Sequence, residues 1–241
     1  MKTYAIGDIH GGYRALQQLI DKLNLDKGDK LIFLGDYVDG WSESAQVIQF
    51  LIELQEQYEC VFILGNHDLW AGRWLNLGAS NPVWEEHGGK ATKSSYQTTG
   101  LLVSQEHKQF FEELKEYYID DQNRLFIHAG YTSIHGVTKE EYTSNFYFDR
   151  TLWEMVVSMN PKLEASDPDF PKRLKHYKEI YVGHTPTTNY GETIPMHRAN
   201  VWNVDTGAAF MGPLSAVNLD SKEIIQSDVV QTLYPNERGR N

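Results

Sequence analysis

The sequence lacks the features that mark several classes of protein. It has one cysteine, Cys60, so no disulfide can form within the chain, which fits a reducing compartment. Its net charge of −11 argues against nucleic acid as a partner, because binding to a phosphate backbone requires a basic face. No apolar run has the length of a membrane span, and the N-terminal residues do not form a signal peptide. We therefore expect a cytoplasmic protein that binds neither nucleic acid nor membranes.

The composition is that of a globular protein. Hydrophobic residues make up 41% of the 241 positions, which is enough for a sizeable core, and we expect a single domain over residues 1–241. An acidic chain can still act on a phosphate substrate, because bound metal ions supply the local positive charge that the chain lacks.

Short apolar runs alternate with stretches whose apolar residues follow a helical period. We expect strands at residues 4–6, 31–34, 61–64, 124–127 and 179–182, and helices at 13–23, 45–58 and 105–118, the second capped by Ser42 or Ser44. Further strands are expected at 199–204, 214–219 and 223–230. This alternation is typical of a parallel sheet covered by helices.

Two segments show no regular period. Residues 69–100 are rich in Trp, Gly, Asn and Ser, and we expect loops with short helices that lie over a functional site. Residues 235–241 are expected to form a frayed tail.

Side chains of the metal-binding type follow five of the predicted strands. They are Asp8 and His10 in GDIHG, Asp36 and Asp39 in GDYVDG, Asn66 and His67 in GNHD, His128 in IHAG, and His184 in VGHT. Ligand sites in α/β sheets form beyond the carboxyl ends of the strands, so these side chains should meet at one edge. Carboxylate, amide and imidazole donors without a thiolate cluster suit Mn, Fe, Zn or another divalent metal.

The number of donors favours two ions that share a carboxylate, because a single catalytic ion needs open positions. Asp8 and His10 would hold the first ion, and Asp36 would bridge. The second ion would be held by Asn66, His128 and His184. His67 would then act as the general acid, oriented by Asp39.

In this order, the five motifs resemble those of the calcineurin-like metallophosphoesterases, and more narrowly the serine/threonine phosphoprotein phosphatase group, which includes bacterial diadenosine tetraphosphatases. The motifs span residues 7–185, and the stretch DTGA at 205–208 resembles a further family segment. The resemblance implies a four-layer α/β/β/α sandwich and a dinuclear metal site, with Mn favoured over Fe, Zn, Ni or Mg. By position, the family's ligands and its Asp-His pair fall on the residues assigned above.

The sequence departs from the family pattern in its second motif. The family continues from the position of Asp39 into Arg-Gly, whereas this chain continues into Gly40-Trp41. That arginine normally holds the substrate phosphate, so either another cation replaces it or phosphate binding is left to the metal ions. The candidates are Arg73, Lys90, Lys93 and Arg150. We predict Arg150, which lies beside an aromatic-rich segment, with Arg73 as the next choice.

We predict a phosphatase that hydrolyses phosphomonoesters on phosphorylated proteins or small molecules, similar to serine/threonine protein phosphatases. A hydroxide held between the two metals would attack phosphorus directly, and His67 would protonate the leaving oxygen. The first alternative is a hydrolase of dinucleoside polyphosphates or other nucleotides, because the aromatic insert 69–100 could stack a base. The second is a catalytically weak phosphate-binding module, which the missing arginine favours.

The remaining histidines and the tryptophans of the insert are expected to have lesser roles. His107 and the other histidines outside the motifs should lie at the surface or in loops, and only His87 should lie near the substrate. Trp70, Trp74 and Trp84 are expected to pack locally or to form a wall of the substrate site.

Overall fold

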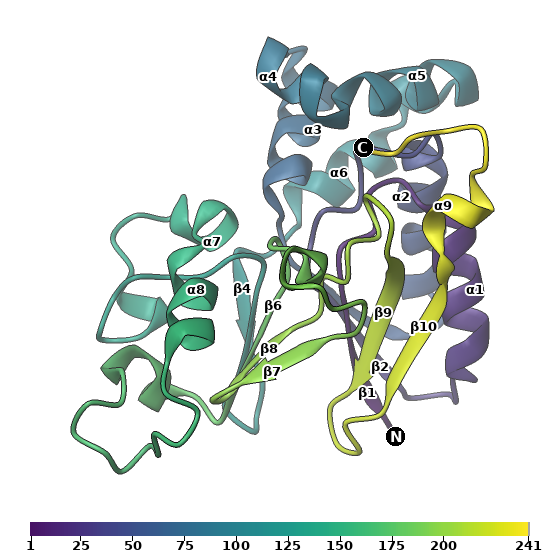
Figure 1. The fold of residues 1–241 in the computed structure, drawn as a ribbon. Helices are drawn as coiled ribbons and strands as arrows, with labels where there is room; N and C mark the ends of the chain where they lie inside the picture. Colours follow the sequence, from purple (N-terminus) through teal and green to yellow (C-terminus); the bar gives the residue numbers. More distant parts are fainter. Residues whose placement is uncertain (241) are drawn as a thin grey trace.

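Two five-stranded sheets form the centre of the protein (Figure 1). The structure is a computed structural model and describes residues 1–240. The first sheet has the order β10-β9-β1-β2-β3, with bounds Ile224–Val229, Pro213–Asn218, Thr3–Ile6, Lys30–Phe33 and Glu59–Phe62. The second sheet has the order β4-β5-β6-β8-β7, with bounds Tyr117–Ile119, Arg124–Ile127, Glu179–Val182, Val201–Asn203 and Met196–Arg198. β1, β2 and β3 are parallel, as are β5, β6 and β8.

The two sheets pack against each other, and helices cover their outer faces. In β1, Ala5 faces the second sheet, while Tyr4 and Ile6 face the helices, so both faces of the strand are buried. This explains why the strands read as continuous apolar runs rather than as alternating ones. Phe126 and Tyr181 supply the second sheet's part of the inner layer. The four-layer α/β/β/α sandwich implied by the resemblance is confirmed.

The helices divide between the two outer layers. The layer on the first sheet contains α1 (Tyr13–Leu23), α2 (Ser44–Gln55), α3 (Asn66–Leu77), α5 (Lys90–Thr99) and α6 (Gln105–Glu112). The second sheet is covered by α8 (Thr151–Ser158) and the short α7 (Asn145–Phe148). α4 (Pro82–Trp84) and α9 (Val230–Leu233) are single turns. None of the helices in residues 1–240 is long and apolar enough to cross a membrane.

Most of the expected elements are present, with shifted ends. The helix at 13–23 and the strands at 124–127 and 179–182 have the expected bounds. The helix expected at 105–118 ends at Glu112, and residues 117–119 form β4 instead. The expected caps of α2 are wrong: Ser42 donates to Glu237, and Ser44 bonds to Thr92, so neither hydroxyl caps the helix. Both hydroxyls form hydrogen bonds with residues distant in sequence instead.

The expectation of loops with short helices at residues 69–100 is confirmed for the helices, but little of this range is loop. α3, α4 and α5 cover most of this range, joined by a kinked segment, Glu85–Gly89. The helical period is hidden in the sequence because α5 buries the polar Thr92 and Ser95, which are satisfied by hydrogen bonds to other segments.

The C-terminal residues 235–240 are not frayed. Tyr234 is buried and its ring stacks on that of Trp41 with centroids 5.2 Å apart, and the backbone N–H of Arg240 donates to the carbonyl of Ala209 at 2.9 Å. The tail prediction failed because it took no account of the buried surface that Trp41 offers. Asn241 lies outside the described residues.

Candidate active site

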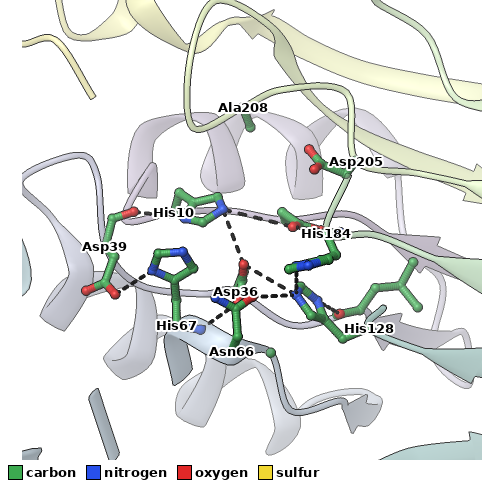
Figure 2. Close-up of polar contacts among 12 residues, drawn as sticks. His10, Asp36, Asp39, Asn66, His67, His128, His184, Asp205 and Ala208 are labelled. Atoms are coloured by element: carbon green, nitrogen blue, oxygen red, sulfur yellow. Dashed lines mark hydrogen bonds and ion pairs between the residues drawn. The ribbon is translucent and has the colours of Figure 1, made fainter. Parts of the chain in front are cut away.

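The predicted donor residues converge between the two sheets, at the carboxyl ends of their strands (Figure 2). Asp8, Asp36 and Asn66 follow β1, β2 and β3 of the first sheet, whereas His128 and His184 follow β5 and β6 of the second. Five of the six proposed ligands are no more than 5% exposed, and His184 is half-buried. The fold therefore brings together every metal-type residue that the sequence analysis placed at a strand end.

Four site residues have backbone conformations that L-amino acids seldom adopt. Their φ angles are 52° for His10, 54° for Asp36, 71° for Asp39 and 66° for His184. Such conformations cost about 1–3 kcal/mol each and persist where the surroundings fix them, which is common at functional sites.

Two glycines make room for the site's carboxylates. A Cβ atom on Gly65 would lie 2.1 Å from Oδ1 of Asp36, and a Cβ on Gly183 would lie 2.1 Å from Oδ1 of Asp8. Only glycine fits at either position without displacing a carboxylate.

Asp36 lies between the two halves of the cluster. Its Oδ2 is 3.5 Å from Nε2 of His10 on one side and 3.4 Å from Nε2 of His128 on the other. Nε2 of His128 is in turn 3.2 Å from Oδ1 of Asn66 and 3.2 Å from Nδ1 of His184. The carboxylate predicted to bridge is thus the one that both halves share.

Backbone contacts fix the orientation of the cluster's side chains. Nδ1 of His10 contacts the carbonyl of Asp39 at 2.9 Å, and Nδ1 of His128 contacts that of Leu34 at 2.8 Å. Each contact leaves Nε2 facing the cluster, which is how metal-binding histidines are usually held. Asp8 accepts a hydrogen bond from the backbone N–H of His184 at 3.1 Å.

Two overlapping groups of donors could each hold an ion, since the ligand atoms within each group lie within 4.8 Å of one another. One group contains His10, Asp36 and His67, and the other contains Asp36, His128 and His184. Asp8 lies beside the first, with Oδ2 3.9 Å from Nε2 of His10. The oxygen and imidazole donors fit a pair of divalent cations.

Burial and close packing strongly affect the ionisation of the cluster. Burial raises the pKa of Asp8 well above its usual range, and Asp205 raises it further. Burial also lowers the pKa of His10 and of His184 well below the usual value. Burial opposes the charge on Asp36 too, but His128 and the other imidazoles outweigh it, and the pKa of Asp36 lies well below normal. Cations in the cluster would offset this concentration of carboxylates.

His67, which belongs to the first donor group, forms a buried pair with Asp39. Nδ1 of His67 is 2.7 Å from Oδ2 of Asp39. The carboxylate is held by the insert as well, because it accepts hydrogen bonds from Nε1 of Trp84 and from Oγ1 of Thr92, each at 2.6 Å. Of the two expectations for Trp84, local packing is correct and a substrate wall is not, since this side chain is fully buried and its Nε1 binds Asp39.

A further carboxylate, that of Asp68, holds the backbone at Asp36 in place. Asp68 accepts hydrogen bonds from the backbone N–H groups of Asp36 at 2.6 Å, Gly65 at 2.9 Å and Tyr37 at 2.9 Å. Nothing in the motif pattern predicts this role of Asp68, because its partners are backbone groups of other segments.

A cavity of about 360 Å³ opens beside the cluster, and its lining includes His10, His184, Asp205 and two arginines, Arg150 and Arg240. Nη1 of Arg150 donates to Oγ1 of Thr185 at 2.9 Å and to the carbonyl of His184 at 3.3 Å.

The structure places Arg73 elsewhere, in a separate cavity with Leu77 and Glu112. Lys93 pairs with Glu85, and Lys90 is exposed. The role of Arg150 and Arg73 in binding substrate stays a prediction, and sequence reasoning missed Arg240 because it expected a frayed tail.

Aromatic side chains border the cluster and the cavity. The ring of Trp70 packs edge-on against His67, with centroids 5.3 Å apart, and Phe148 lies next to Trp70 at 5.7 Å. Tyr190 and Phe210 line the cavity. Phe148 is 41% exposed and Tyr190 37% exposed, so both present ring surface to a ligand.

Comparison with known proteins agrees with this geometry. The model of the calcineurin-like phosphoesterase family matches residues 1–209. The asymmetrical bis(5'-nucleosyl)-tetraphosphatase PrpE of Oceanobacillus iheyensis is 27% identical, over 93% of this chain and 91% of that protein. A symmetrical bis(5'-nucleosyl)-tetraphosphatase of Neisseria gonorrhoeae is 26% identical, over 94% and 95%. A crystal structure of a protein assigned as a diadenosine tetraphosphatase has the same fold, with a TM-score of 0.61 at 18% identity over 93% of this chain and 92% of that one.

Proposed function

The chain belongs to the calcineurin-like phosphoesterase family, and from this premise we propose that it hydrolyses a phosphoanhydride bond of dinucleoside polyphosphates. The main support is the pair of donor groups that share Asp36, one of which includes His67, the partner of Asp39. The relatives named as tetraphosphatases favour this substrate class, which the sequence analysis held as an alternative, over phosphorylated proteins.

The residues that would hold two divalent ions are the six predicted ligands. Asp8 and His10 would hold one ion, Asn66, His128 and His184 the other, and Asp36 both. Bound there, the ions would supply charge that stabilises the transferring phosphoryl group and would lower the pKa of a water molecule.

His67 would protonate the leaving oxygen. Asp39 occupies its Nδ1, which leaves Nε2 directed toward the cluster as the site of the transferred proton. Asp39 cannot rotate away, because Trp84 and Thr92 bind both of its oxygens.

Arg150 and the bordering aromatic rings would position the substrate. The guanidinium of Arg150 is fixed by Thr185 and lies in the same cavity as His184, where its forked donors suit a phosphate group. Trp70, Phe148 and Tyr190 offer faces on which a nucleobase could stack.

The second candidate is a phosphomonoesterase similar to serine/threonine protein phosphatases. The donor groups and the His67–Asp39 pair act at the transferred phosphoryl group, and the exposed Arg150 could meet a phosphorylated side chain as well as a nucleotide. A catalytically weak phosphate-binding module is less well supported, because the predicted ligands and the acid pair come together.

The test compares three substrates on Mn²⁺-loaded protein: diadenosine tetraphosphate, a phosphopeptide and p-nitrophenyl phosphate. We expect the highest kcat/KM on diadenosine tetraphosphate, and chromatography of the products distinguishes AMP plus ATP from two ADP. His67→Ala should lower kcat by about 10²–10⁴-fold without changing the metal content measured by mass spectrometry. Turnover of the phosphopeptide alone would overturn the proposal in favour of the second candidate, and no turnover with any divalent metal would favour the binding module.

A further inference from the structure

The C-terminal segment, residues 230–240, is held against the second motif by two aromatic side chains. Trp41 is fully buried, stacks on Tyr234 with ring planes 22° apart, and donates from Nε1 to the carbonyl of Ala208 at 2.8 Å. A tryptophan at this position therefore fixes both the segment and the loop after β8.

Polar contacts continue this attachment as far as Arg240. Glu237 accepts hydrogen bonds from the backbone N–H of Ser42 at 3.0 Å and from its hydroxyl at 2.7 Å. Gly239 has a φ of 59°, and a Cβ there would lie 2.7 Å from the Trp41 ring and 2.6 Å from the carbonyl oxygen of Ala209. The segment thus follows a defined path that needs a glycine immediately before Arg240.

This path brings the side chain of Arg240 to the cluster. Its Cγ lies 3.3 Å from where a Cβ on Gly40 would be, and its guanidinium lies over the ring of Phe210 at 5.4 Å. Arg240 shares the cavity with His10 and Asp205.

Arg150 lies on the other half of the cluster. Its Nη1 donates to the carbonyl of His184 at 3.3 Å. The two guanidinium groups therefore lie next to the two different donor groups that Asp36 joins.

We propose that Arg240 and Arg150 form a two-arginine clamp that binds the phosphoryl groups of the substrate, one arginine beside each donor group. This inference rests on the proposed function and adds a residue from the C-terminal segment to its substrate site. Within residues 1–240, no carboxylate forms an ion pair with Arg240, so its donors are available to an anion. Gly40 stands where the resembled family has a phosphate-binding arginine, and the next residue, Trp41, would act indirectly by holding the segment that supplies Arg240.

The chemistry of the cavity suits this role. Asp8, Asp36 and Asp205 are buried together, and an anionic substrate that approaches them needs positive charge besides that of metal ions. Arginine donors to phosphate are forked and charge-assisted, and they bind best where the side chain is held in place, as both of these are.

The experiment measures binding of inorganic phosphate to Mn²⁺-loaded protein by titration calorimetry, so that no substrate has to be turned over. Arg240→Ala should weaken phosphate binding by about tenfold, with unchanged metal content, whereas Arg240→Lys should recover part of the loss. Arg198→Ala, an exposed arginine beside a different cavity, is the matched control and should bind phosphate as the wild type does.

A second pair of variants tests the attachment of the segment without changing the cavity. Ser42→Ala and Glu237→Gln weaken the contact that precedes Arg240, and both should reduce phosphate affinity in the same direction as Arg240→Ala but by less. The double variant Arg150→Ala/Arg240→Ala should deviate from the sum of the single effects if both arginines bind one phosphoryl group.

The outcomes separate this inference from the proposed function. Wild-type phosphate affinity in Arg240→Ala, together with weakened binding in Arg150→Ala, would overturn the clamp. Phosphate binding that depends on Arg240 in a protein that does not hydrolyse diadenosine tetraphosphate would support the clamp and reject the proposed substrate.

Discussion

At the scale of single residues, the site depends on its glycines as much as on its charged side chains. The carboxylates of Asp8 and Asp36 lie in the spaces that Gly183 and Gly65 leave open. A sequence shows such glycines but not the atoms that approach them, so the motifs could identify the ligands without explaining the glycines' positions.

Gly183→Ala provides a test at this scale. The added methyl group would lie 2.1 Å from Oδ1 of Asp8, so the carboxylate must move away from the first donor group. We expect the metal content per chain, measured by mass spectrometry after dialysis, to fall by about one ion, with at least a tenfold loss of kcat. Gly100→Ala is the control for backbone strain alone, because its φ of 73° disfavours alanine but a Cβ there would meet no atom within 4 Å. A Gly183→Ala protein that retains the wild-type metal content would show that Asp8 is not held by this contact.

The clustering of the donor residues could be predicted from sequence, whereas the residues that hold them in place could not. Asp8, Asp36 and His128 each follow a strand within a recognisable motif. Thr92 and Trp84 have no such motif, because their relation to Asp39 exists only in three dimensions.

At the scale of elements, the insert is the part whose structure differs most from the expectation, and it holds the carboxylate of the His67–Asp39 pair. α5 brings Thr92 to Asp39, and its hydroxyl both donates to Oδ1 of Asp39 at 2.6 Å and accepts from its backbone N–H at 3.0 Å. Sequence periodicity failed here because buried polar residues and aromatic packing replace the apolar stripe of an ordinary helix.

Thr92→Val and Thr92→Ser form a matched pair of variants. Valine keeps the shape but removes the hydroxyl, so Asp39 loses a partner at each of two atoms. We expect kcat to fall by about tenfold with KM and metal content little changed. Thr92→Ser keeps the hydroxyl and should retain most of the activity. Equal activity in the two variants would show that the hydroxyl of Thr92 does not position Asp39.

α5 and α6 also enclose His107, which the sequence analysis expected at the surface. The side chain is fully buried, with Nδ1 3.0 Å from the Tyr96 hydroxyl and Nε2 3.0 Å from Oε1 of Gln49, an arrangement that satisfies a neutral imidazole. Burial lowers the pKa of His107 to about 4.

The sign of the pH dependence follows from this lowered pKa. Below pH 6.5, the ordinary pKa of histidine, His107 is protonated in the unfolded chain. In the folded protein it stays neutral until about pH 4. The part of the free energy of unfolding that depends on a neutral His107 is fully present above pH 6.5. It is lost as the pH falls toward 4, and the loss is at most about 3 kcal/mol.

His107→Gln should reduce this acid sensitivity, because glutamine can replace both hydrogen bonds without titrating. The measurement is urea unfolding in EDTA at several pH values between 4 and 7, with the exposed His135→Gln as control. A pH profile of His107→Gln that is parallel to the wild type would contradict a buried neutral His107.

At the scale of the whole molecule, the cluster joins the two sheets. Asp36 belongs to the first sheet and His128 to the second, and their side chains lie 3.4 Å apart. Ions held by both would therefore stabilise the packing of one sheet on the other.

Metal addition tests this connection. Mn²⁺ at about one hundred times its Kd should add about 2.7 kcal/mol to the free energy of unfolding, and EDTA should reverse the gain. Asp36→Asn, which removes the shared charge, should lose most of this response in thermal unfolding. An unchanged Tm on addition of Mn²⁺, Fe²⁺ or Zn²⁺ to the wild type would contradict metal binding by folded residues of both sheets.

The order of strands in the first sheet has a consequence for how the protein is made. β1 lies at the centre of the sheet, but its partner on one side, β9, pairs Tyr4 with Asn218 from the other end of the chain. During synthesis, the backbone N–H and C=O groups of β1 that pair with β9 stay unpaired until nearly the whole polypeptide has left the ribosome. We expect slow folding and a need for chaperone protection during synthesis, with nascent fragments that aggregate through this apolar edge.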